Sequence, residues 1–183
     1  MQLFAKSRLL AGAPVANGSS FGTLYHGTAK PFKTFSQDKS YAASQYGVGA
    51  YLTEDKTGYA RFFARVACSN HDETMFEDGY VLTVKVKSEA KILDLRKSDA
   101  DKKAKTMWKQ AVTDYHLGPK LREYVMSLGY DGIAYTEPFF PEGNVVKPNA
   151  LTVVVYNTPL AVIEKAESFT NIKRPTFEEY GYK

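Results

Sequence analysis

The hydrophobic and polar positions of this chain follow the periods of both strands and helices. Residues 79–87 (GYVLTVKVK) alternate between apolar and polar side chains, as a half-buried strand does, whereas the β-branched run 151–156 (LTVVVY) suits a central strand covered on both faces. Between Asp55 and Val66, aromatic and apolar residues recur at helical spacing and predict a helix. The remaining pattern predicts short strands at 23–25, 50–53, 92–95, 133–135 and 160–163, and helices at 99–114 and 119–128.

These elements describe one mixed α+β domain. The chain has 183 residues, of which 44% are hydrophobic and 24% charged, so it can bury a core and is not disordered throughout. No repeat or Pro/Gly/Ser linker divides it. We therefore expect a single domain over residues 21–183, with a loop over 30–49, and a flexible or loosely packed leader over residues 1–20.

The composition excludes several classes of protein. No apolar run approaches the roughly 18 residues of a membrane span. The single cysteine, Cys68, excludes an internal disulfide framework and a cysteine-rich zinc site, and three scattered histidines do not suggest a metal site, so no metal is expected. The N-terminal segment lacks the apolar h-region of a secretory signal; a transit-like or secretion-system leader is the alternative to a loosely packed one.

The charge is unevenly distributed along the chain, whose net charge is +4. Residues 96–109 hold six basic and two acidic residues and net +4, residues 1–37 also net +4, and the other segments together net −4. One interpretation of the 96–109 stretch is a solvated helix face with its tryptophan on the buried side. The other is a docking patch for nucleic acid or an acidic protein, in which cations attract phosphates or carboxylates and the tryptophan stacks. The docking residues are then Lys102, Lys103, Lys105 and Trp108.

A Tyr25-His26-Gly27-Thr28 run ends the first predicted strand. A histidine at that place can hydrogen-bond a ligand hydroxyl, and a glycine after it lets the backbone approach a planar amide closely. Taken alone, the run is more typical of a structural histidine before a turn.

A second run, GVGAYLTED (47–55), has glycines before a strand that presents Tyr51 and acids that cap the following helix. Phe62 comes eleven residues after Tyr51, on that helix. Two aromatic rings held on a strand and on the next helix can sandwich a flat cationic ring such as nicotinamide. Each feature alone is more typical of core packing; together and in this order they indicate a binding site.

These motifs resemble the ADP-ribosyltransferase fold of the diphtheria-toxin and poly-ADP-ribose-polymerase branch, which uses a His-Tyr-Glu triad. The resemblance rests on YHGTAKP (25–31) and GVGAYLTEDKTGYARFF (47–63), and more weakly on the strand order of 79–163. It implies an α+β fold with a pair of facing, mostly antiparallel β-sheets, flanking helices and an NAD cleft between the sheets. NAD is then the co-substrate.

The resemblance assigns roles to the motif residues. His26 holds the ribose hydroxyls on the adenosine side of NAD. The backbone of Gly27 pairs with the nicotinamide carboxamide, and Thr28 sits beside it. Tyr51 and Phe62 stack on the nicotinamide ring.

Three positions depart from the family pattern. Phe62 replaces the usual tyrosine and loses a hydroxyl, while Tyr59 stands where the polymerases have a small hydroxyl residue. The family's glutamate, which bonds the ribose 2′-hydroxyl and steadies positive charge, normally begins a late strand, and Thr152 falls at that place. Three alternatives stay open: a genuine variant with Thr152, a carboxylate reaching in from Glu137 or Glu142, or a misaligned motif.

The resemblance implies a mono-ADP-ribosyltransferase that cleaves the nicotinamide–ribose bond of NAD and transfers ADP-ribose to a macromolecule, with protein favoured over RNA or DNA. An NAD glycohydrolase, a non-catalytic NAD or ADP-ribose binding module and a basic RNA-binding domain are the alternatives. Such proteins are often bacterial or phage toxins or effectors, so we expect an inhibitor or antitoxin as a further partner. We also expect a monomer that is cytoplasmic or delivered into a target cell.

Overall fold

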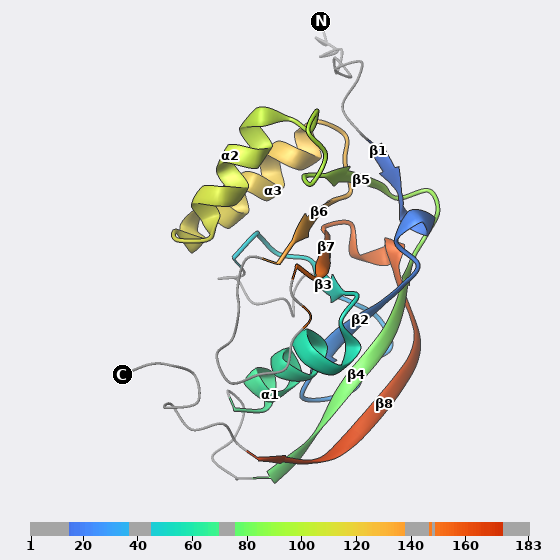
Figure 1. Cartoon of the computed structure of the whole chain (residues 1–183). Coiled ribbons are helices and arrows are strands. Elements are labelled where there is room, and N and C mark those ends of the chain that lie inside the picture. Colours follow the sequence, from blue (N-terminus) through green and yellow to red (C-terminus); the bar gives the residue numbers. More distant parts are fainter. Residues whose placement is uncertain (1–14, 37–44, 70–75, 138–146, 148, 174–183) are drawn as a thin grey trace, which may run out of the picture.

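The computed structural model describes residues 15–36, 45–69, 76–137, 147 and 149–173. Within them the chain forms one sheet and three α-helices (Figure 1). The strands are β1 (Val15–Asn17), β2 (Thr23–Thr28), β3 (Ala50–Thr53), β4 (Phe76–Val86), β5 (Lys91–Asp94), β6 (Gly132–Thr136), β7 (Leu151–Val155) and β8 (Ala161–Lys173). The helices are α1 (Arg61–Ser69), α2 (Lys102–Ala111) and α3 (Gly118–Ser127), with short helical turns at Gly18–Phe21, Lys56–Ala60, Tyr115–Leu117 and Thr158–Leu160.

The strand order is β1-β5-β6-β7-β3-β2-β4-β8, and every neighbouring pair is antiparallel except β5 with β6. The expected α+β class with mostly antiparallel strands is therefore confirmed. The expected pair of separate facing sheets is not, because hydrogen bonds join all eight described strands into one sheet. No cleft between two sheets follows from this topology, so the NAD cleft stays a prediction.

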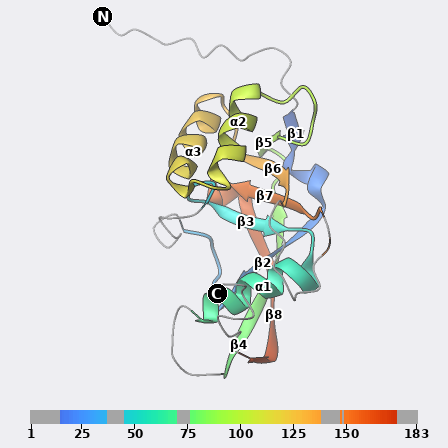
Figure 2. The ribbon, with the colours of Figure 1, turned by 60° about the vertical axis from the view of Figure 1, so that its left-hand side comes forward.

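The sheet nevertheless consists of two halves that meet between β2 and β3. One residue pair, Tyr25 with Thr53, joins these two strands, whereas six pairs join β2 to β4 and four join β3 to β7. In Figure 2, β3, β6 and β7 run across the direction of β4 and β8. Strand twist accumulates across a sheet, and here it separates β2 from β3 beyond their single pair.

The core lies on both faces of the central strand β7, as its apolar sequence predicts. Every residue of β7 is buried. Val153 and Val155 belong to one apolar cluster with Leu52 of β3, and Val154 belongs to a second cluster with residues of α2 and α3. The alternation of a strand thus supplies both cores.

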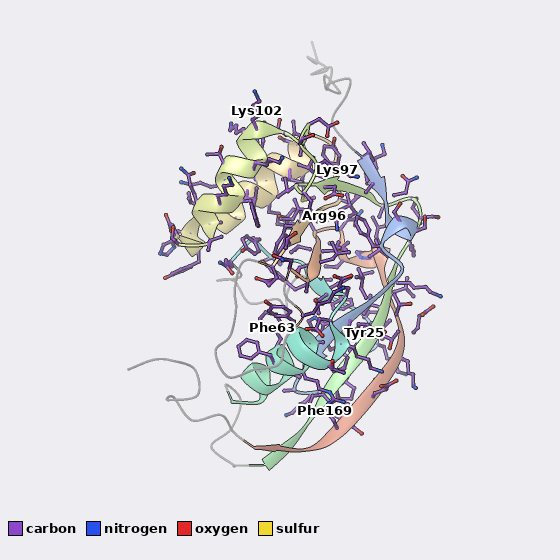
Figure 3. The ribbon with its side chains drawn as sticks, in the orientation of Figure 1. Tyr25, Phe63, Arg96, Lys97, Lys102 and Phe169 are labelled. Atoms are coloured by element: carbon purple, nitrogen blue, oxygen red, sulfur yellow. The ribbon has the colours of Figure 1, made fainter. Side chains whose placement is uncertain are left out.

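All three α-helices lie on the second of these faces. The helices α2 and α3 pack on β5, β6 and β7, while α1 packs on β2 and β4 (Figures 1 and 2). Figure 3 shows Lys102 at the start of α2 and Phe63 on α1. The basic stretch and α1 therefore lie at different ends of the helical face.

Helix boundaries follow local signals. The carboxylate of Asp101 accepts a hydrogen bond of 2.7 Å from the Ala104 N–H, so α2 begins at Lys102, later than the predicted residue 99. Helix α3 has a proline in its first turn, and it is followed by Gly129 at φ +85°, as the sequence predicts. Among the described residues, none of the helices combines the length and apolar character that a bilayer crossing requires.

The ends of the chain differ from expectation where the pattern is short or polar. Val15–Asn17, expected in the leader, form β1 and pair with β5, so ordered structure begins before residue 21. Three residues are too few to show alternation. Strand β8 runs for 13 residues, far beyond the predicted 160–163. The prediction missed most of it because it is an edge strand rich in polar residues, which hide the hydrophobic pattern of a strand. Residues 1–14, part of the predicted loop (37–44) and the C-terminal tail (174–183) lie outside the described residues.

Candidate functional site

A row of four residues crosses the centre of the sheet on its helical face. Tyr135 of β6 lies opposite Thr152 of β7, Thr152 opposite Thr53 of β3, and Thr53 opposite Tyr25 of β2. Residues directly opposite each other in a sheet point to the same face. Tyr51, two residues before Thr53, points to that face as well. The register thus brings Tyr51 and Thr152, two of the predicted site residues, onto one surface.

Glu137 joins this row from the end of β6. Its backbone N–H donates to the Ala150 carbonyl at 2.9 Å, and its carboxylate Oε2 accepts a hydrogen bond of 3.2 Å from the Thr152 hydroxyl. Both side chains are buried, at 8% and 4% exposure. Two alternatives left open by the sequence are therefore in contact, and an acid lies next to the residue at the glutamate position. Glu142 lies outside the described residues.

The negative charge of Glu137 acts on three tyrosine side chains of the site. Burial, followed by the negative charge of Glu137, raises the pKa of Tyr59 to about 12 and raises the pKa of Tyr46 and of Tyr135 well above the ordinary value. These hydroxyls are therefore protonated at neutral pH and can act as hydrogen-bond donors around the acid.

Tyr51 is fixed by its hydroxyl. That oxygen donates to the Gly47 carbonyl and accepts from the Tyr46 N–H, both at 2.9 Å, while the two tyrosine rings lie nearly parallel with centroids 6.4 Å apart. Gly47 has φ +92°, and a Cβ there would lie 2.7 Å from the Arg122 Cβ, so glycine is needed at this turn. The glycine-flanked tyrosine of the sequence motif is thus one rigid unit.

His26 follows Tyr25 on β2, so its side chain points to the opposite face of the sheet, but it reaches the backbone of Tyr51 at the split between β2 and β3. Its Nδ1 lies 2.9 Å from the Tyr51 carbonyl oxygen, which can only accept, so Nδ1 carries the proton. Burial lowers the pKa of the ring, although the hydrogen bond to Tyr51 opposes that shift. In the resulting neutral imidazole, Nε2 is an acceptor. The rings of Phe32 and Phe35 pack edge-on against it at 5.7 and 5.1 Å.

The next two residues of the motif have local structural roles. A Cβ added to Gly27 would lie 1.9 Å from the Ala60 carbonyl oxygen and 2.6 Å from the Ala64 nitrogen, so glycine lets α1 lie against β2. The Thr28 hydroxyl donates to the Lys30 carbonyl at 3.1 Å. Packing against α1 is a sufficient reason for glycine here, and the predicted backbone contact with a carboxamide stays a prediction.

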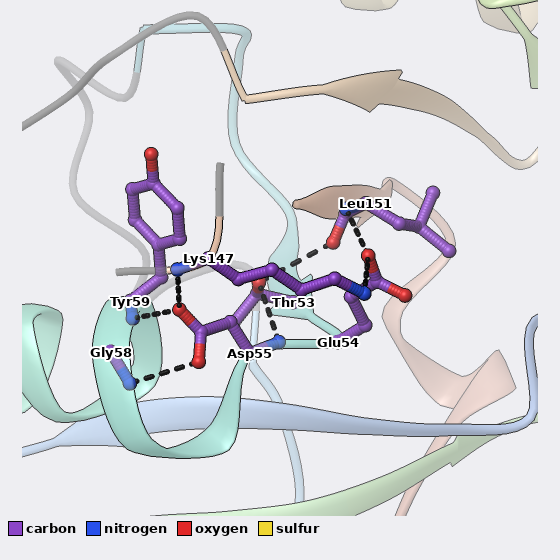
Figure 4. Close-up of polar contacts among 7 residues, drawn as sticks. All are labelled: Thr53, Glu54, Asp55, Gly58, Tyr59, Lys147 and Leu151. Carbon is purple, nitrogen blue, oxygen red and sulfur yellow. Dashed lines mark hydrogen bonds and ion pairs between the residues drawn. The ribbon is translucent and has the colours of Figure 1, made fainter. Parts of the chain in front are cut away.

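Of the two acids after β3, Asp55 caps the following helix, as predicted, and Glu54 does not (Figure 4). The Asp55 carboxylate accepts from the Gly58 N–H at 2.9 Å, the Tyr59 N–H at 3.1 Å and the Lys147 N–H at 2.8 Å. The Glu54 carboxylate accepts from the Leu151 N–H at 2.9 Å and the Lys147 ammonium at 2.8 Å. These two acids therefore tie the start of β7 to the start of the helix, which the sequence did not indicate.

The aromatic residues of that helix form a cluster. Tyr59 is fully buried within a wide, π-type turn (Lys56–Ala60), a type of turn frequent at functional sites, and its ring stacks on Phe63 at 6.4 Å. Phe62, the predicted stacking residue, is 7% exposed and meets Phe63 edge-on at 5.4 Å. Phe63, which is not among the predicted site residues, is 41% exposed. The eleven-residue spacing from Tyr51 selected Phe62 and carried no information about the exposure of its neighbour.

Several side chains of the basic stretch have partners within the domain. Arg96 pairs with the Asp94 carboxylate through two hydrogen bonds of 2.8 Å, and the Lys103 ammonium lies 4.4 Å above the Tyr124 ring. Trp108 is half-buried against Tyr135, with ring centroids 5.6 Å apart. The tryptophan therefore packs on the core, and docking through Lys102, Lys103 and Lys105 stays a prediction.

Comparisons with known proteins give little independent information. No protein-family model matches the chain, and no curated protein matches it. A solved structure, the crystal structure of the M. tuberculosis MbcT-MbcA toxin-antitoxin complex, is similar with a TM-score of 0.46 and 14% identity, over 81% of this chain and 84% of that chain. A likeness at this TM-score supports no conclusion about the present chain, so the function is inferred from the site itself.

Removing the Asp55 carboxylate tests the helix start. We expect Asp55→Ala to lower the free energy of unfolding by about 1–2 kcal/mol, because the helix N-terminus loses its acceptor. Denaturant unfolding measures the change. The matched control is Asp114→Ala, which removes an exposed cap that accepts from the His116 N–H at 3.1 Å and should cost about 0.5 kcal/mol or less. Equal losses in both variants contradict the interpretation.

The pH dependence of stability tests the state of His26. Its pKa is lowered from 6.5 in the folded protein, so the unfolded chain binds the proton more readily. The stability from the neutral ring is complete above about pH 6.5 and is lost as the pH falls, by at most about 1.4 kcal/mol per pH unit. We expect wild type to lose more stability between pH 7.5 and 5.5 than His26→Asn, which keeps a donor near Nδ1. Parallel pH curves contradict this.

Proposed function

We propose that this protein is a mono-ADP-ribosyltransferase, which cleaves the nicotinamide–ribose bond of NAD and transfers ADP-ribose to a macromolecular acceptor. The observation that carries the proposal is the buried Glu137 carboxylate, held by Thr152 on the face that also presents Tyr51. It supplies an acid at the place where the sequence motif lacks one. With Glu137, the His26 and Tyr51 motifs would supply the three groups of the family's His-Tyr-Glu triad.

The binding half of the site rests on His26 and Tyr51. The neutral His26 ring keeps Nε2 as an acceptor for a ribose hydroxyl, since Nδ1 is committed to the Tyr51 carbonyl. The Tyr51 ring, fixed by its hydroxyl, offers a face for nicotinamide, and the resemblance assigns the second face to Phe62, which is 7% exposed. Gly27 and Thr28 border the carboxamide. Rigid placement of these groups lowers the entropy cost of orienting NAD.

The chemical step needs one negative charge near the ribose. Heterolysis of the C1′–N bond leaves its electron pair on the nicotinamide nitrogen, so nicotinamide departs neutral and the ribose becomes an oxocarbenium ion. A nucleophile of the acceptor then bonds to C1′ and loses a proton. Glu137 accepts a hydrogen bond from the ribose 2′-hydroxyl and stabilises the developing positive charge. Thr152 positions Glu137 by donating to its Oε2.

We expect the acceptor to be a protein rather than RNA or DNA, as in the family that the motifs resemble. The lysines of α2 would form the surface where this protein docks. A role as a toxin or effector, with an inhibitor or antitoxin as partner, belongs to the same proposal.

Incubation of the purified protein with biotinylated NAD in a cell lysate tests the proposal. Label should enter the protein fraction and disappear after protease treatment. His26→Ala and Tyr51→Ala serve as inactive controls, checked for folding by circular dichroism. Free ADP-ribose without labelled macromolecule identifies a glycohydrolase instead. Binding of NAD with no release of nicotinamide contradicts any enzyme.

Glu137→Gln tests the assignment of the acid. We expect kcat for nicotinamide release to fall about 10²–10³-fold with KM for NAD nearly unchanged, because the charge acts in the transition state. The matched control is Glu142→Gln, expected to stay near wild type. Thr152→Val, which removes the hydroxyl but keeps the shape, should cause a smaller loss. An active Glu137→Gln beside an inactive Glu142→Gln would overturn the assignment.

A further inference from the structure

Glu54 directly follows β3 and is the motif acid that does not cap a helix. Its backbone N–H donates to the Leu151 carbonyl at 3.0 Å, and its carboxylate Oε1 accepts from the Leu151 N–H at 2.9 Å (Figure 4). Residues that face each other in a hydrogen-bonded antiparallel pair normally exchange both bonds through their backbones. Here the Glu54 side chain takes the place of its own backbone carbonyl.

This arrangement follows from the way β3 ends. After Thr53 the chain turns into the helical segment Lys56–Ala60, which Asp55 caps. The ladder between β3 and β7 ends at the pair of Thr53 with Thr152. The Glu54 carboxylate therefore carries the pairing of the two strands one residue further than the backbone of β3 can.

The added pair borders the candidate acid. Leu151 immediately precedes Thr152, whose hydroxyl donates to the Glu137 carboxylate at 3.2 Å. On the other side of β7, Leu151 is opposite Thr136 of β6, and Glu137 follows Thr136. A shift of Leu151 would therefore move Thr152 relative to Glu137.

Glu54 is a charged acceptor at neutral pH. Burial raises the pKa of its carboxyl group, but the Leu151 N–H and the Lys147 ammonium together hold it below the ordinary value. The ammonium lies 2.8 Å away, and the lysine and glutamate side chains are 58% and 32% exposed, so their ion pair contributes little. The bond to the Leu151 N–H is part-buried, and we expect it to hold the strand.

We propose that Glu54 is a positioning residue: by extending the pairing of β3 with β7 to Leu151, it holds Thr152 at the Glu137 carboxylate. Glu54 has no contact with NAD in this arrangement and acts on the reaction only through Thr152 and Glu137. Its effect on catalysis rests on the proposed function, whereas its effect on the contact between Thr152 and Glu137 does not. The two effects are therefore measured separately.

Two measurements on the protein without NAD test the contact. In Glu54→Ala, exchange of the Leu151 amide proton, followed by NMR, should be about tenfold faster, because that N–H loses its acceptor. In a crystal structure of this variant, the distance between Thr152 Oγ1 and Glu137 Oε2 should exceed about 3.5 Å. Glu54→Gln keeps an acceptor at Oε1 and should restore both values. An unchanged contact in Glu54→Ala overturns the proposal.

Steady-state kinetics test the consequence for catalysis. Glu54→Ala and Glu54→Leu should each lower kcat for nicotinamide release about tenfold with KM for NAD nearly unchanged, a typical effect of losing a supporting hydrogen bond. Glu54→Gln should recover most of this loss, and Lys147→Met, which removes only the exposed ion pair, should stay near wild type. Equal losses in Glu54→Gln and Glu54→Ala contradict the role of the bond to Leu151.

A double variant tests whether Glu54 acts through Thr152. Thr152→Val removes the hydroxyl that Glu54 is proposed to hold in place. Glu54→Ala combined with Thr152→Val should therefore lose no more kcat than the larger of the two single losses. Losses that multiply show that the two residues act independently, and they overturn the proposal.

Glu164→Ala is the matched control. It removes a glutamate of similar exposure, 39%, which pairs with the Lys85 ammonium at 2.8 Å across β4 and β8, and it should leave kcat unchanged. If Glu54→Ala matches this control while Glu137→Gln is inactive, the proposed function stands and this inference fails alone. If the wild type turns over no NAD, the proposed function fails, and amide exchange and the crystal structures still decide the positioning.

Discussion

The two halves of the sheet meet at one residue pair, Tyr25 with Thr53, and the candidate site depends on this constraint. Past that pair β2 and β3 diverge, so their backbone groups need other partners. The His26 imidazole bonds the Tyr51 carbonyl, and the Asp55 carboxylate binds three N–H groups from the helix and from Lys147. The side chains that bind these backbone groups, His26 and Asp55, are therefore residues of the two sequence motifs.

Signals near the N-terminal motifs are local, and they were sufficient to predict structure there. The short run after the glycines predicted β3, helical spacing predicted the helix after it, and an acid before that helix indicated its cap. Strand β8 was largely missed because Glu164, Lys165 and Glu167 give it the polar character of a loop, and its pairing with β4 is a long-range contact. Such polar edges protect a sheet from pairing with other chains.

The contact between Glu137 and Thr152 could not be predicted, because it depends on the register between β6 and β7. Slipping that register by one residue would turn either side chain to the opposite face. The sequence therefore left both as alternatives. Electrostatic stabilisation depends on where a charge lies and not on which strand carries it, so an acid absent from β7 can be replaced from the end of β6.

The strand order has a consequence for when the site exists. Thr53 bonds the Leu151 carbonyl across 98 residues of sequence, and β7 lies between β6 and β3. On the ribosome, β3 is therefore made long before its neighbour, and a nascent chain holding only the His26 and Tyr51 motifs lacks the strand that orders them. Contacts so distant in sequence form late and slowly in folding. During synthesis, the candidate site can therefore assemble only after β7 has been made.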